Sequence, residues 1–278
     1  MTLVGSSLVS SATAAAHPAL QLPFPQGKAW IYLGGPHNTN GCPDGGFTCV
    51  NPRPWNSLDF TTASRHGTVT AAADGVVQST NQCPANSNFV IINHGGGWHT
   101  TYYHLINIRV KPGDHVHAGQ PLGSISATHG CGGHADTAHV HFSVAHYSGG
   151  YTWHKGQVDL GGFRIGAWVF HDGPTQYSGC ATNVYTGRRV CPGGVLSNNP
   201  ATHSCSIPGG AEGGTGTLPF TTVGLSCTDG KAVIEAGGGQ SSTWSALGFQ
   251  CRYLTTPQPG APIRCTRGSE SVSWNQVG

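Results

Sequence analysis

Two histidines separated by a single residue, His139 and His141, form the clearest chemical pattern in the chain. In a β-strand, residues i and i+2 project from the same face, so this pair would present both imidazoles to one site. The spacing alone does not identify a metal site, because the chain has 16 histidines. His115 and His117 share the spacing, but their Gly-Asp and Ala-Gly flanks are typical of an exposed hairpin, where a solvated pair is the simpler interpretation.

Three further residues carry groups that a metal site would use. His104 ends an aromatic-rich segment, where it is equally compatible with core packing, and His37 follows a Gly-Gly-Pro turn. Asp59 lies between Leu58 and Phe60, whose side chains would point to the opposite face of a strand. Because a buried carboxylate without a partner is costly, Asp59 requires one.

These residues together match the requirements of a catalytic zinc site. Such a site takes three protein ligands from His, Asp, Glu or Cys and leaves a fourth position for water. His37, Asp59 and His141 would supply the ligands, and His104 and His139 would lie beside the open position. We therefore expect one Zn²⁺ ion per chain.

The proton carriers of this site must be histidines. The first glutamate of the chain is Glu212, and no HExxH motif is present, so the mechanism of thermolysin-like peptidases is excluded for the residues before it. Zinc lowers the pKa of its bound water to about 7, and histidine, with an ordinary pKa of about 6.5, can move the proton. His104 and His139, beside the open position, would be the available proton carriers, in roles that the sequence does not divide between them.

Short strands must position these groups, and the expected fold class is all-β. β-branched and aromatic segments alternate with Gly, Pro, Asn and Asp, and no sustained 3.6-residue apolar period is evident. A short strand is also expected between the turn signals of residues 111–120. The expected strands are 28–33, 57–62, 67–72, 75–79, 89–94, 99–105, 121–126 and 139–146.

The amino-acid composition excludes several classes of protein. Charged residues make up 9% of the chain and the net charge is +2, too little for a nucleic-acid-binding protein, whose affinity comes from many phosphate contacts. No run of 18 apolar residues is present, so no membrane-spanning helix is expected. The ten cysteines contain no CxxC pair, which favours a disulfide framework in an exported protein over zinc-finger ligands.

Export agrees with the first residues of the chain. Residues 1–16 are small, apolar and uncharged and end in AxA patterns, as in a remnant of a secretory signal peptide without its basic start. The alternative is an unstructured tail. We therefore expect a secreted, extracellular protein with five disulfides. Proximity favours Cys42–Cys49 and Cys180–Cys191, which leaves Cys83 to pair with Cys131.

The amino-acid composition changes near residue 195, where proline and glycine become frequent. We expect a large domain over 17–195, a Pro- and Gly-rich, linker-like segment over 196–219, and a small β module over 220–278. Similar segments at Cys227 and Cys265 suggest two strands that each begin at a cysteine. Pairing among the last four cysteines stays open, although Cys205–Cys227 and Cys251–Cys265 would fit this repeat.

The role of the small module also stays open. It is either a packed structural appendage or a targeting module for wall glycan or another polymer surface. Four aromatic residues would either stack on sugar rings or form the core of the module: Trp244, Phe249, Tyr253 and Trp274.

The motifs of residues 20–192 resemble those of a known family. The chain is similar to the β-lytic metalloendopeptidases and staphylolysin, the secreted branch of the lysostaphin-type zinc peptidases that cut bacterial peptidoglycan. The cysteines near 83/131 and 180/191 also fit. The matching segments, in chain order, are Leu20–Pro25, Gly34–Asn40, Asn56–Asp59, Ile91–Trp98, Thr100–Leu105 and His139–Ser143.

The resemblance implies an antiparallel β-sheet peptidase fold and assigns roles by position. The zinc ligands would be His37, Asp59 and His141, and the catalytic histidines His104 and His139. Tyr177 matches, with a spacing that differs by one, a tyrosine that helps to stabilise the transition state. The segment between the first two ligands is longer than in these relatives, and Asp44 is the rival second ligand if the alignment shifts there.

The implied substrates are Gly- or Ala-containing bonds in the stem peptides or cross-bridges of peptidoglycan, and the implied state is a monomer. The main alternative is a non-catalytic secreted relative that binds or regulates the cell wall, although all five site positions are present. A lipoyl-like carrier is a further alternative, suggested by residues 110–120. Lys111 precedes a proline rather than occupying a hairpin tip, which disfavours it.

Overall fold

The computed structural model describes most of the chain. The described residues are 17–39, 53–80, 89–129, 134–148, 156–198, 202–208, 216–225, 227–236, 242–267 and 270–275. The expected signal-peptide remnant, the rival ligand Asp44, and the cysteines of the expected pairs Cys42–Cys49 and Cys83–Cys131 lie outside these ranges.

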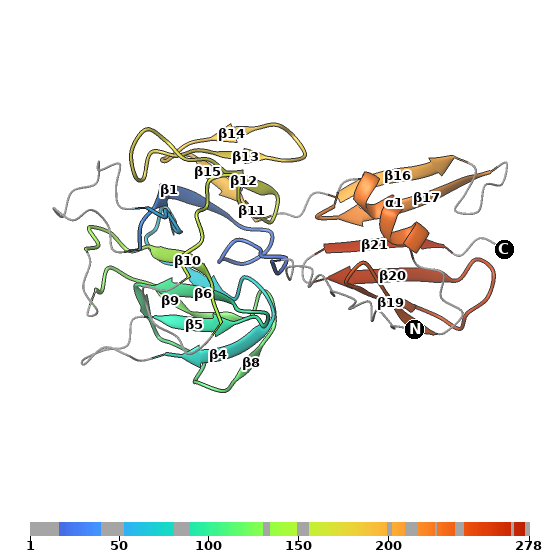
Figure 1. Cartoon of the computed structure of the whole chain (residues 1–278), viewed down its shortest axis with the longest axis horizontal. Coiled ribbons are helices and arrows are strands. Elements are labelled where there is room, and N and C mark those ends of the chain that lie inside the picture. Colours follow the sequence, from blue (N-terminus) through green and yellow to red (C-terminus); the bar gives the residue numbers. More distant parts are fainter. Residues whose placement is uncertain are drawn as a thin grey trace, which may run out of the picture.

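An eight-stranded sheet forms the centre of the larger part of the molecule (Figure 1). All of its paired strands are antiparallel. In spatial order the strands are β15 (Val195–Ser197), β1 (Ala29–His37), β2 (Ser57–Thr61), β10 (Val140–His146), β6 (Trp98–Tyr103), β5 (Val90–Asn93), β4 (Gly75–Ser79) and β8 (His115–Val116).

Two smaller sheets accompany the central one. The first contains β3 (Thr68–Thr70), β9 (Pro121–Ile125) and β7 (Leu105–Ile106). The second contains β11 (Arg164–Ile165), β12 (Trp168–Phe170), β13 (Ala181–Asn183) and β14 (Arg189–Val190). The expected all-β fold is confirmed, and each segment predicted as a strand overlaps one. The sequence analysis missed β11 to β15, which are only two or three residues long and too short to show an alternation.

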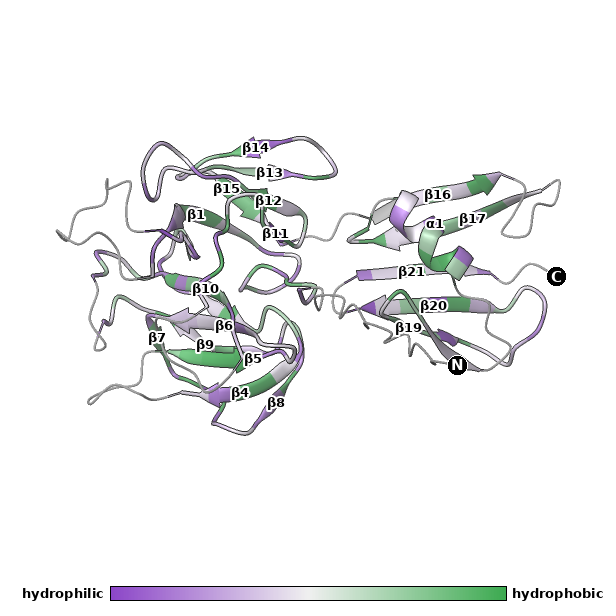
Figure 2. Cartoon of the chain, viewed as in Figure 1, coloured by the Kyte–Doolittle hydropathy of each residue, from purple (hydrophilic) through white to green (hydrophobic). Residues whose placement is uncertain are grey.

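Strand alternation divides the central sheet into a core face and a site face. On β10, Val140, Phe142 and Val144 belong to the hydrophobic core, and on β2 Leu58 and Phe60 do the same. The residues between them, including His141 and Asp59, point to the other face. Figure 2 shows the resulting concentration of hydrophobic residues on the inner strands such as β5.

A second sheet with its own hydrophobic core follows residue 198. In spatial order its strands are β16 (Thr202–Pro208), β17 (Thr217–Val223), β21 (Glu270–Asn275), β20 (Pro262–Arg267), β19 (Phe249–Tyr253) and β18 (Thr243–Ala246). Helix α1 (Cys227–Ala236) lies across one face of this sheet (Figure 1). We call residues 202–275 with these elements the C-terminal module.

Three details of the C-terminal module correct the sequence analysis. The segment expected to be linker-like over 196–219 contains β16 and the first residues of β17. Cys227 begins a helix rather than a strand, and Cys265 lies inside β20 rather than at its start. The helix was missed because it spans ten residues, with only Gly230, Val233 and Ile234 buried, which is too little for a clear 3.6-residue period.

The aromatic residues of this module serve mainly as its core. Phe249 is 1% exposed and Trp274 is 8% exposed, and both belong to the hydrophobic core that also contains Val233 and Ile234 of α1. Trp244 and Tyr253 are half-buried against the same core. Of the two alternatives left open by the sequence, Phe249 and Trp274 therefore follow the one in which they form the core of the module.

Three expected disulfides are present in the described residues: Cys180–Cys191, Cys205–Cys227 and Cys251–Cys265. Cys205–Cys227 joins β16 to the start of α1, and Cys251–Cys265 joins directly opposed residues of β19 and β20. Both of these disulfides stabilise a core that is small for an independent unit.

The two parts of the molecule meet at one end of the second sheet. Arg164 donates a hydrogen bond to the carbonyl of Gly224 across the junction. A cavity of about 830 Å³ lies there, lined in part by Asp74, Arg164 and Arg267, and it contains none of the predicted site residues. Within the described part of the chain, no helix has the length and apolar character to cross a membrane.

Candidate functional site

Register places the three predicted zinc ligands side by side. His141 of β10 is paired directly with Asp59 of β2, and Asp59 is also opposite Gly34 of β1. The pairing of β1 with β2 then shifts before it reaches His37, which is opposite Ser57. Such an irregularity changes the direction in which a side chain points. Here the His37 imidazole points toward Asp59, although the two residues are not directly paired.

The ligand atoms of this group converge in a buried position. His37 Nε2 lies 3.1 Å from His141 Nδ1 and 3.5 Å from Asp59 Oδ1, and His141 Nδ1 lies 3.2 Å from the same oxygen. Zinc–ligand bonds of about 2.0–2.1 Å in a tetrahedron separate neighbouring ligand atoms by about 3.3 Å. These three residues are also the group of metal-ligating side chains that the described chain brings together.

Hydrogen bonding prepares these groups for a cation. His37 Nδ1 lies 2.7 Å from the carbonyl oxygen of Gly35, which can only accept, so His37 carries its proton on Nδ1 and leaves Nε2 bare. Asp59 Oδ1 is buried and accepts no hydrogen bond within the described residues, although imidazole nitrogens surround it. A buried oxygen in this state is costly unless a charge compensates it, so the donor set fits a divalent cation such as zinc.

Electrostatics keep the ligand set in its metal-binding protonation state. Burial lowers the pKa of His37 to about 4, which leaves the imidazole neutral at pH 7. Burial by itself would raise the pKa of Asp59, but the neighbouring His37 and His139 outweigh it and hold the pKa of that carboxyl well below its usual range. The site therefore presents a carboxylate and a neutral imidazole.

The two predicted catalytic histidines lie beside the ligands. The rings of His104 and His139 are 4.5 Å apart, and His139 Nε2 is 3.6 Å from Asp59 Oδ1. His104 donates Nδ1–H to the carbonyl of Thr128 at 2.6 Å, and His139 donates Nδ1–H to that of Thr137 at 2.8 Å. Both rings thus keep Nε2 free as a proton acceptor.

His104 occupies a backbone position that most residues avoid. Its φ angle is +60°, in the left-handed region, directly after β6. The carbonyl oxygen of His104 accepts hydrogen bonds from the backbone nitrogen and the hydroxyl of Ser126, which hold this conformation. Burial, followed by the neighbouring His139 and His141, lowers the pKa of His104 to about 3, so the ring is neutral at pH 7.

Tyr177 packs directly on His37, the first of the predicted ligands. Its ring is stacked on His37 at 3.9 Å between centroids, and burial, followed by the charge of Asp59, raises its pKa. The backbone of Tyr177 also has a positive φ of 65°. Backbone hydrogen bonds from Gly35 to Tyr177 and from Tyr177 to Pro36 attach this loop to the end of β1.

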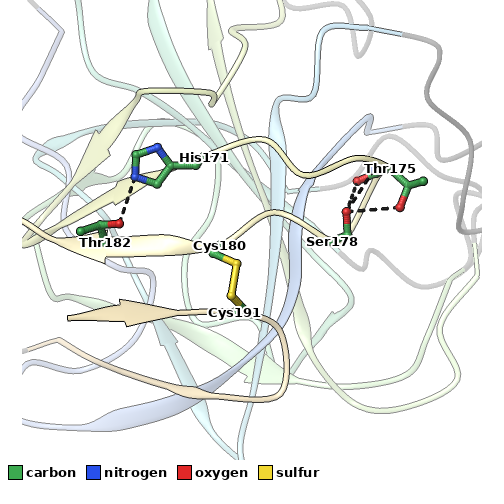
Figure 3. The surroundings of a disulfide bond; sticks show 6 residues. All are labelled: His171, Thr175, Ser178, Cys180, Thr182 and Cys191. Carbon is green, nitrogen blue, oxygen red and sulfur yellow. Dashed lines mark hydrogen bonds between the residues drawn. A yellow bond between two sulfur atoms is a disulfide. The ribbon is translucent and has the colours of Figure 1, made fainter. Parts of the chain in front are cut away.

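A disulfide and a turn fix the loop of Tyr177 (Figure 3). Ser178 donates its hydroxyl to the carbonyl of Thr175 at 2.6 Å, which closes the turn around Tyr177. Two residues later, Cys180 is bonded to Cys191. The loop is thereby linked to the hairpin of β13 and β14.

The sequence analysis missed the residues that orient the site. Gln176 is 1% exposed and accepts a hydrogen bond from the backbone nitrogen of Asn38 at 2.6 Å, next to the first ligand. Thr128 and Thr137 contribute only their carbonyl oxygens. A backbone acceptor leaves no signal in residue type, and the only sequence indication for Gln176 is its position beside Tyr177.

Gly35 provides a test of this close packing. A Cβ at Gly35 would overlap the carbonyl of Gly179 and lie 2.6 Å from its nitrogen, because β1 and the Tyr177 loop are in backbone contact there. We expect Gly35→Ala to lower the free energy of unfolding by about 1–3 kcal/mol, as overpacking does. Gly216→Ala is the control, because a Cβ there meets nothing within 4 Å. Denaturant unfolding of both variants measures the difference, and equal stabilities would contradict the described contact.

Comparison with known proteins agrees with this geometry. The model of the family described as Peptidase family M23 matches residues 53–157. The beta-lytic metalloendopeptidase of Lysobacter enzymogenes is 30% identical over 192 residues, and the match covers 65% of this chain and 97% of that protein. The chain belongs to peptidase family M23.

Two further proteins extend the comparison. The beta-lytic metalloendopeptidase of Achromobacter lyticus is 31% identical over 193 residues, but the chain spans only 46% of its length. The solved structure of the M23 metalloprotease pseudoalterin from the deep sea superposes with a TM-score of 0.52 at 28% identity, over 66% of this chain and 99% of that one. The M23 fold and a metallopeptidase domain are therefore established for this chain.

Proposed function

We propose that this protein is a secreted zinc endopeptidase that hydrolyses Gly- or Ala-containing peptide bonds of bacterial peptidoglycan. The observation that carries the proposal is the convergence of three ligand atoms at distances suited to one tetrahedral ion, with the imidazoles of His104 and His139 beside them. His37 Nε2, Asp59 Oδ1 and His141 Nδ1 would hold the ion. When bound, zinc supplies a water with a pKa of about 7 and polarises the scissile carbonyl.

His104 and His139 are placed to move the protons of the reaction. Each carries its own proton on Nδ1 and has a free Nε2, so either can accept the proton that the attacking water loses. As the C–N bond breaks, the same proton is returned to the leaving amine, which departs neutral. Fixed carbonyl partners hold both rings, so little reorganisation is needed during the reaction.

Tyr177 would assist on the other side of the ligand set. Its raised pKa keeps the phenol protonated at neutral pH, so it can donate a hydrogen bond to negative charge that develops on the scissile carbonyl oxygen. Stacking on His37 and the closed turn around Thr175 and Ser178 fix the ring in place.

Support for the substrate class comes from the family, which consists of peptidoglycan-acting peptidases, and from the resemblance of the motifs to the β-lytic branch. Disulfides in the described residues support an oxidising compartment. The peptidoglycan-acting family and the disulfides are both consistent with an enzyme that hydrolyses cell walls outside the cell that produces it.

Digestion of purified peptidoglycan tests the substrate. The zinc-loaded protein is expected to release fragments whose new amino termini are glycine or alanine, identified by mass spectrometry, and a chelator is expected to stop the release. A non-catalytic, wall-binding relative would sediment with the walls and release nothing. Cleavage at bonds without glycine or alanine would contradict the proposed specificity.

A further inference from the structure

The face of the C-terminal module opposite α1 carries a row of polar residues that crosses all six strands. Alternation directs these side chains away from the core residues between them, such as Cys251 and Cys265. The pairing registers align one residue from each strand, in spatial order Ser204, Thr221, Ser273, Arg264, Arg252 and Thr243. We call this set the arginine row.

Two arginines occupy the middle of the arginine row with no opposite charge. Arg252 and Arg264 are directly opposed on β19 and β20, and both are exposed. Within the described residues neither guanidinium has an ion-pair partner, whereas the neighbouring Arg267 is paired with Glu270. Like charges opposed across two strands are unfavourable unless something compensates them.

The acidic residues on the helix of the module lie away from the arginine row. Asp229 and Glu235 lie on α1, where Lys231 pairs with Glu235. No acidic residue of the described chain lies in the arginine row. The open face is therefore positive and rich in hydroxyl groups, while the helix face carries the acidic groups.

Side-chain chemistry identifies the class of partner. Two adjacent guanidinium groups present planar forks that match phosphate oxygens in a bidentate manner. The hydroxyls of Thr221, Ser273 and Thr243 extend the row of donors on either side. An extended row of this kind suits a repeating polyanion better than a single small ion.

From this charge complementarity we propose that the arginine row docks the protein on a phosphodiester-linked polymer of the bacterial cell wall. The inference rests on the proposed function, because it supplies a wall-targeting surface for a wall peptidase. The proposed surface is basic, whereas the targeting alternative considered for the sequence was aromatic.

Binding of polyglycerol phosphate to the full-length protein tests the inference. We expect the double variant Arg252→Gln/Arg264→Gln to bind at least ten times more weakly than the unaltered protein. The matched control is Arg188→Gln/Arg189→Gln, which removes two exposed, adjacent arginines near β14 of the larger part. Its affinity should stay within about twofold. Equal losses of affinity in both double variants would show that binding depends only on net charge, which would contradict a specific arginine row. Absence of binding by the unaltered protein would also overturn the inference.

Purified walls distinguish the phosphate from other anions. Sedimentation with walls should fall when hydrofluoric acid has removed their phosphodiester polymers, and it should then no longer depend on Arg252 and Arg264. Binding to stripped walls that still depends on both arginines would assign the surface to the carboxylates of peptidoglycan instead, against the proposal. Hydrolysis of a small soluble peptide reports separately on the proposed function, and the variant should match the unaltered protein in that assay.

Discussion

Replacing either of the two proposed catalytic histidines is expected to abolish most of the activity without loss of zinc binding. His104→Asn and His139→Asn should each lower kcat for a soluble peptide substrate by about 10²–10⁴-fold, the range of general acid–base catalysis. Asparagine suits position 104 because it tolerates the left-handed backbone region, where the φ angle is +60°. Zinc content and thermal stability, measured on the same preparations, should match those of the unaltered protein.

The double variant separates two accounts of the pair. If His104 and His139 serve one proton-transfer sequence, His104→Asn/His139→Asn should fall little below the more damaged single variant, because residues that act as a unit are not additive. His66→Ala is the control, since His66 is exposed and its hydrogen bonds within the described residues go only from its backbone to Thr62 and Ser64. Full activity in either single asparagine variant would remove that residue from the catalytic roles.

Loss of a ligand is expected to remove both zinc and activity. His37→Ala, Asp59→Ala and His141→Ala should each weaken zinc binding by more than about 100-fold, because outer-shell substitutions alone cost 10–100-fold. The three buried ligand atoms lie 3.1 to 3.5 Å from one another, and each variant removes one of them, so only two ligands of the set remain. Competition with a fluorescent zinc chelator measures the affinities.

Asp44 provides the counter-test of the second ligand. It was the rival to Asp59 in the sequence analysis and lies outside the described residues. Asp44→Ala should keep full zinc affinity. If Asp44→Ala lost zinc and Asp59→Ala retained it, the assignment of Asp59 would be wrong.

Strand periodicity explains why much of the site was predictable from the sequence. His139 and His141 are two residues apart, and Asp59 alternates with core residues, so their common face follows from the strand geometry of β10 and β2. Cross-strand pairing then placed His141 opposite Asp59. Local pattern alone did not reveal this register, which depends on contacts across the sheet.

The parts that escaped prediction depend on tertiary contacts. Stacking of Tyr177 on His37 requires a loop that is far away in sequence, and Gln176 acts through a backbone nitrogen. In the C-terminal module, the aromatic residues Phe249 and Trp274 pack beneath α1. Composition cannot decide whether an aromatic residue stacks on a ligand or fills a core. In both cases the side chain is stabilised by burying the same apolar ring surface.

Titration of the metal-free protein with zinc tests the central claim most directly. The claim is that one ion, held by His37, Asp59 and His141, is required for hydrolysis. Peptidase activity should be absent without metal, rise in proportion to added zinc and reach its plateau at one equivalent per chain. Activity in the metal-free protein, or a plateau reached only at two equivalents, would contradict it.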